Sequence, residues 1–175
     1  MKTRTQKLCA AAVCLALALL LPFLTGQMQS LGNALCLMHL PVLLCGYICG
    51  GVWGLCVGFA APLLRFALFG MPPVYPLGLA MAFELGCYGL VAGLLYRKLP
   101  KTPAMLYVSL LTAMLAGRLV WGGVRLLCAG LTGAAFPFSA FLAGAVTQAV
   151  PGIVLQLLLV PALVRSVEKV TGLTK

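Results

Sequence analysis

The chain has 175 residues, of which 63% are hydrophobic and 8% charged, whereas a soluble domain is about half apolar and a quarter charged. So much apolar surface cannot be buried inside one small core, and the chain is therefore expected to be solvated by lipid. Twelve Lys and Arg residues against two carboxylates give a net charge of +10, which in a membrane protein indicates orientation rather than nucleic-acid binding.

The same composition excludes several kinds of chemistry. Glu84 and Glu168 carry the only side-chain carboxylates, and His39 is the only histidine. An aspartyl dyad, a two-metal carboxylate site and a multi-histidine zinc site therefore have too few residues. The P-loop pattern GxxxxGK[ST] does not occur. We expect no metal or cofactor, and any energy source would have to lie outside this polypeptide.

Apolar stretches long enough to cross a bilayer core of about 30 Å follow one another along the chain. From Leu40 to Gly70 only Arg65 is charged, and one helix of this length would span about 46 Å, so the doublet Gly50-Gly51 is expected to divide it. The first stretch also resembles a signal peptide, but its apolar run is long and no clear cleavage site follows, so we interpret it as a retained helix. The sequence predicts an all-α integral membrane protein with one domain over 1–175 and six transmembrane helices, at about 8–25, 35–50, 52–70, 77–96, 104–129 and 138–165.

The basic residues of the loops predict the orientation of these helices. With six spans, the N-terminus, the loop at 97–103 and the C-terminus share one side and carry nine basic residues, whereas the opposite loops at 26–39, 71–76 and 130–137 carry none. Merging 40–70 into one span would break this asymmetry. Because cytoplasmic loops are rich in Lys and Arg, both termini are predicted to be cytoplasmic, in a bacterial plasma membrane.

Five ionisable residues remain inside the predicted spans, where charge is costly and usually marks a functional site or an internal ion pair. Helix direction places all five in the outer half of the membrane. Arg118 and Arg125 are seven residues apart and share one helix face, with Trp121 between them. The five residues are His39, Arg65, Glu84, Arg118 and Arg125.

Two interpretations of these residues stay open. The first is a pocket that opens to the outside, with a net charge of +2 and an aromatic wall that includes Tyr88 and Trp121, suited to a ligand with a carboxylate or phosphate. The second is a structural Glu84–Arg118 pair, with the other arginines extending to the outer headgroups. Three arginines against one carboxylate favour the pocket, and extension to the headgroups explains Arg125 most readily.

Small and polar residues carry weaker signals. Gly46, Gly50, Gly54 and Gly58 form overlapping GxxxG steps, which favour a tight hairpin of the second and third helices. The eight cysteines are expected to be buried packing residues, without a disulfide framework or metal site. In the last helix, Gln148 and Gln156 are either ligand donors or partners of neighbouring helices.

Two segments resemble a known family. Residues 40–50 and 54–59 resemble the hairpin of helices 2 and 3 in the substrate-binding S components of energy-coupling factor (ECF) vitamin transporters. Residues 70–73, followed by 80–85, 88–89 and 93–96, resemble the outer loop and helix 4 of that family. The resemblance extends over nearly the whole chain.

This resemblance implies a membrane-embedded subunit that binds a vitamin or related micronutrient with high affinity near its outer surface. The loop Gly26–His39 would form a lid, and a transmembrane T component with two cytoplasmic ATPases would supply the energy. On the first helix, Ala12 and Ala16 match the small-residue pattern that contacts the T component. The positive pocket slightly favours an anionic substrate.

The expected substrate-binding residues fall into three groups. Arg118, Glu84 and Arg65 are the polar anchors, and Trp121 and Tyr88 provide stacking surfaces. Contacts from the lid side are His39 and Asn33, and Arg125 and Gln148 complete the set.

Two other functions compete with this hypothesis. A structural membrane subunit of the rod-shape-determining type would need no small ligand. An intramembrane enzyme is disfavoured, because serines such as Ser109 and Ser139 lack an evident base.

Overall fold

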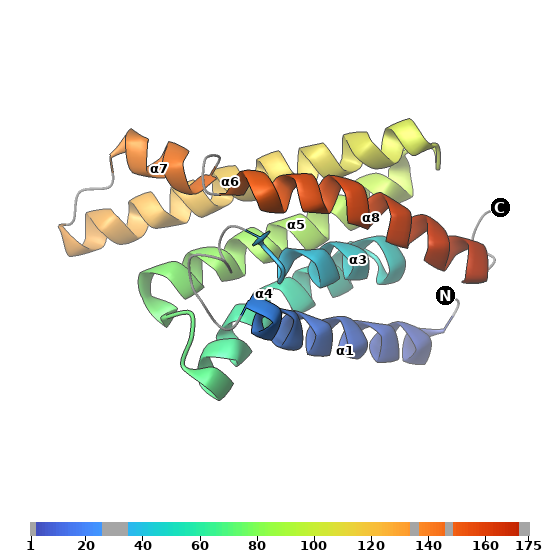
Figure 1. Ribbon diagram of the computed structural model, residues 1–175, viewed down its shortest axis with the longest axis horizontal. Coiled ribbons are helices and arrows are strands. Elements are labelled where there is room, and N and C mark those ends of the chain that lie inside the picture. Colours follow the sequence, from blue (N-terminus) through green and yellow to red (C-terminus); the bar gives the residue numbers. More distant parts are fainter. Residues whose placement is uncertain (1–2, 26–34, 134–136, 146–148, 172–175) are drawn as a thin grey trace.

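The computed structural model describes residues 3–25, 35–133, 137–145 and 149–171, and these ranges contain helices and no strand. The helices lie side by side as a bundle, and the start of α1 and the end of α8 lie at the same end of it (Figure 1). The helices are α1 (Arg4–Leu20), α3 (His39–Cys49), α4 (Gly51–Phe69), α5 (Leu79–Lys98), α6 (Pro103–Thr132), α7 (Phe138–Ala145) and α8 (Val150–Thr171), with the short helical turns η1 (Leu21–Thr25) and η2 (Val74–Gly78).

Five segments are long and apolar enough to cross a membrane, which makes this a multi-pass membrane protein. In the described part of the chain they are Arg4–Leu24, Gly51–Phe69, Val74–Lys98, Pro103–Thr132 and Val150–Lys169. The predicted second span is the shorter apolar helix α3, with 11 residues. The count of six spans and the side on which the termini lie therefore stay predictions.

The boundary between α3 and α4 lies at Gly50, as the glycine doublet predicts. Gly50 has a φ of 107°, a backbone conformation that residues with a side chain rarely adopt. Its amide donates to the carbonyl of Gly46, and α4 begins at Gly51. The long apolar stretch from Leu40 to Gly70 is thus two helices.

The GxxxG glycines bring three helices into close contact, one more than the expected hairpin. A Cβ added at Gly54 of α4 would lie 2.7 Å from the carbonyl oxygen of Gly89 in α5 and 2.8 Å from the Cα of Gly46 in α3. Gly58 of α4 approaches the backbone of Leu85 in α5 in the same way. These glycines set how closely α5 approaches the pair α3–α4.

The last predicted helix, at 138–165, covers two described helices. Phe138–Ala145 forms α7, and α8 begins at Val150 and continues to Thr171. Pro151 is the second residue of α8, where its missing N–H costs nothing, whereas within a longer helix it would remove a hydrogen bond. Residues 146–148 between α7 and α8 lie outside the described residues, so one continuous helix over 138–165 stays a prediction.

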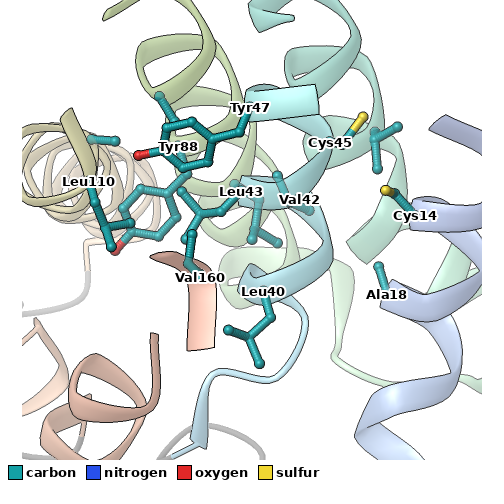
Figure 2. Close-up of a cluster of buried hydrophobic side chains, with 14 of the residues drawn as sticks. Cys14, Ala18, Leu40, Val42, Leu43, Cys45, Tyr47, Tyr88, Leu110 and Val160 are labelled. Carbon is teal, nitrogen blue, oxygen red and sulfur yellow. The ribbon is translucent and has the colours of Figure 1, made fainter. Parts of the chain in front are cut away.

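The buried core joins α1, α3, α4, α5, α6 and α8, and Figure 2 shows part of it. All eight cysteines are free thiols. Most of them are buried packing residues, as expected, and Figure 2 shows Cys14 of α1 and Cys45 of α3 on facing helices. The expectation fails for Cys9 and Cys56, which are exposed on the outside of the bundle.

Candidate functional site

A buried carboxylate forms the centre of the candidate site. Glu84 lies in the second turn of α5 and is 1% exposed. Its Oε1 is 2.9 Å from Nη1 of Arg118 in α6 and 3.5 Å from Nε2 of His39 at the start of α3. Three of the predicted site residues thus meet from three different helices.

The guanidinium of Arg118 has a second partner that the sequence did not indicate. Its Nη2 donates to Sγ of Cys36 at 3.4 Å. Cys36 is buried and has a φ of 49°, which is uncommon for a residue with a side chain. In the sequence, Cys36 falls within the loop at 26–39, which the charge pattern assigns to the outer side. The residues directly before α3 therefore contribute Cys36 to the site.

Tyr88 lies one turn after Glu84 on α5 and is completely buried. Its ring packs edge to face on His39, with ring centroids 5.1 Å apart. A Cβ on Gly117 of α6 would lie 2.7 Å from two carbons of this ring, so Gly117 makes room for it. The predicted stacking surface is thus an inner wall of the site.

Several buried polar atoms in this region have no hydrogen-bond partner among the described residues. An unsatisfied buried polar group costs about 1–3 kcal/mol, and folded proteins keep few of them. Their concentration here is typical of a site that forms hydrogen bonds to a ligand. They include Nδ1 of His39, Nε of Arg118 and, on α8, both amide atoms of Gln156.

The structure does not bring Arg65 to Glu84. Arg65 of α4 is 4% exposed, and its Nη1 donates to the carbonyl of Leu19 at 2.7 Å. Its guanidinium carbon also lies 5.3 Å from the ring centroid of Phe23 and 5.7 Å from that of Phe69. These contacts join α4 to the end of α1, away from the ion pair.

Trp121 and Arg125 of α6 form a separate group. The Arg125 guanidinium lies 5.9 Å from the centroid of the Trp121 ring, within the range of a cation–π interaction. Trp121 packs with Ala80 of α5 and Phe141 of α7. Ala80 is one turn before Glu84, so this aromatic group lies one turn beyond the ion pair, towards the start of α5.

The remaining predicted residues divide by location. Asn33, Gln148 and most of the expected lid lie outside the described residues. Ala12 and Ala16 are exposed on α1. Among the described residues, no cluster of three or more His, Cys, Asp or Glu side chains is arranged to hold a metal ion.

Comparison with known proteins identifies one family. The family model described as ECF transporter, substrate-specific component matches residues 6–164, which is most of the chain. Comparisons with curated proteins and with solved structures find no match. The chain belongs to the family of ECF transporter substrate-specific components.

Proposed function

We propose that this protein is the high-affinity, membrane-embedded subunit that binds a vitamin or related micronutrient for uptake. The substrate site is the group formed by His39, Glu84, Tyr88 and Arg118. The observation that carries this proposal is the concentration of buried, unsatisfied polar atoms around a central ion pair. Such atoms weaken an empty site and gain hydrogen bonds when a ligand enters.

The slight preference for an anionic substrate depends on Arg118 alone. Arg65 has a backbone carbonyl and two phenyl rings as partners, and Arg125 lies over Trp121. The charge of Arg118 is paired with Glu84, but its buried Nε has no hydrogen-bond partner among the described residues. A carboxylate or phosphate on the substrate would be bound through that N–H.

Energy comes, in this proposal, from a transmembrane T component and two cytoplasmic ATPases, with both termini of this chain in the cytoplasm of a bacterium. The exposed face of α1 that carries Ala12 and Ala16 supports a contact with another membrane helix, because small residues allow close approach. The chain is not an enzyme in this proposal. Ser109 donates to the carbonyl of Leu106 and faces the Tyr47 hydroxyl, which does not make it a nucleophile.

The test is a thermal unfolding screen of the purified protein with riboflavin, thiamine, pyridoxine, nicotinamide, nicotinate, biotin, pantothenate and folate. A compound that binds only the folded state raises the stability by about 2.7 kcal/mol at 100 times its Kd. We expect at least one compound to raise the Tm and Arg118→Ala to abolish that rise. Arg125→Ala, on the same helix, is the matched control and should keep the rise in Tm.

Two outcomes would contradict this proposal. A stabilising compound that binds Arg118→Ala and Glu84→Gln as tightly as the wild type would remove the site assignment. No stabilisation by any of the eight compounds would contradict the proposed substrate class and favour a scaffold subunit. The family assignment argues against that alternative.

A further inference from the structure

We propose that Gln156 of α8 forms a further wall of this site and selects an uncharged substrate group in which a hydrogen-bond donor lies next to an acceptor. This inference rests on the proposed function, because it assigns specificity to the same site. It adds α8 to the helices α3, α5 and α6 that contribute the ion pair and its neighbours.

The position of Gln156 follows from the helices that surround it. Leu43 of α3, Tyr88 of α5 and Val160 of α8 belong to one buried cluster and are neighbours in Figure 2. Figure 1 shows that these three helices run in the same direction along the bundle. Residues four apart on a helix share a face, one turn from each other.

A buried polar residue lies one turn before each of these three residues. His39 precedes Leu43 by four residues, Glu84 precedes Tyr88, and Gln156 precedes Val160. Nε2 of His39 lies 3.5 Å from Oε1 of Glu84, so these two turns of α3 and α5 are at the same height in the bundle. α8 packs directly on α3 and α6, and its shared direction with α3 and α5 points to the same level for Gln156.

The surroundings of Gln156 favour a ligand contact over a helix-to-helix bond. Its side chain is 0% exposed, and neither the amide nitrogen nor the amide oxygen has a partner among the described residues. An amide presents donors and an acceptor side by side and carries no charge. The charge of Glu84 is already paired with Arg118.

A substrate group that satisfies this amide therefore carries an N–H next to a C=O or a ring nitrogen. Carboxamides, imides and ring lactams have this arrangement, whereas a carboxylate has no donor. A site that is built to hydrogen-bond a group discriminates strongly against analogues that lack it, because its own polar atoms stay unpaired.

The experiment uses the full-length protein and the same eight compounds. Gln156→Leu removes both polar atoms, Gln156→Glu keeps the shape and removes the donor, and Ser166→Ala is the control on the same helix. The Ser166 hydroxyl bonds only within its helix, to the carbonyl of Ala162. The readouts are the Tm without compound and the Kd of every compound that stabilises the wild type.

We expect Gln156→Leu to leave the Tm without compound unchanged or higher, because it removes two unsatisfied polar atoms. The same variant, and Gln156→Glu, should raise the Kd at least 10-fold, while Ser166→Ala leaves both values unchanged. The stabilising compound should carry the donor–acceptor group.

Three results would overturn the inference. A Kd of Gln156→Leu within threefold of the wild type would exclude the contact and leave the proposed function intact. A lowered Tm without compound, with an unchanged Kd, would show a structural role for the amide. No stabilisation by any compound would remove the proposed function and this inference with it.

Discussion

Arg65 is a buried charge whose guanidinium donates a hydrogen bond to one backbone carbonyl, that of Leu19. The turn η1 begins directly after α1, and in a turn of this type the donor to the Leu19 carbonyl would be Pro22, which has no N–H. Arg65 supplies that hydrogen bond from α4. The expectation that Arg65 anchors the substrate came from its charge and depth alone, and the contacts described for it are the Leu19 carbonyl and the rings of Phe23 and Phe69.

This contact predicts a separation of stability from binding. Arg65→Met should lower the free energy of unfolding by about 1–3 kcal/mol, because the Leu19 carbonyl loses its donor inside the membrane. The Kd of any compound found in the screen should stay within threefold. Lys98→Met removes a charge of the same sign from an exposed site and should leave the Tm unchanged. Loss of binding in Arg65→Met at unchanged stability would restore Arg65 as a substrate contact.

Glycine residues allow the backbones of α3, α4 and α5 to approach one another closely. Gly46 and Gly54 meet Gly89, so that α3, α4 and α5 touch through their backbones. The GxxxG spacing indicated close helix contact, but not that α5 would be the common partner. That choice positions Glu84, which lies on α5 just beyond the glycine contact.

At this contact, Gly54→Ala should lower the stability by about 1–3 kcal/mol. The added Cβ would lie 2.7 Å from a carbonyl oxygen and 2.8 Å from a Cα, so backbone rather than a flexible side chain must move. Gly130→Ala in α6, where no atom lies within 4 Å, is the control and should be neutral or slightly stabilising. Thermal unfolding of the two variants in detergent measures the difference. Equal Tm values would show that the helices are not in close contact.

At the end of the bundle opposite to the candidate site, hydrogen bonds and an aromatic contact link the helices. The hydroxyl of Tyr96 in α5 donates to Oε1 of Glu168 in α8 at 2.6 Å, and both side chains are buried. Tyr47 of α3 packs edge to face on Tyr96 and is 3.0 Å from the Ser109 hydroxyl of α6. Four helices are joined here, whereas near Glu84 several polar atoms have no hydrogen-bond partner among the described residues.

Removing the hydrogen bond between Tyr96 and Glu168 should weaken the packing of α8 on the bundle. We expect Tyr96→Phe to lower the stability by about 1–3 kcal/mol, because Glu168 loses its donor while remaining buried. Tyr107→Phe, at an exposed tyrosine of α6, should change it by less than about 0.5 kcal/mol. Unfolding curves of both variants and the wild type provide the comparison, and a Tyr96→Phe variant as stable as Tyr107→Phe would contradict the link.

The sequence by itself determined the environment of this protein, its helical class and the position of most helix boundaries. Those properties follow from local signals, namely apolar composition, the length of each apolar stretch and the glycine doublet at Gly50-Gly51. Only the tertiary structure decided that Arg118, rather than Arg65, pairs with Glu84, that Arg118 also contacts Cys36, and that the Gln156 amide is buried without a partner among the described residues. These partnerships depend on the rotation of each helix and on which helices become neighbours. Both are decided by packing between residues far apart in the chain, and sequence spacing does not encode them.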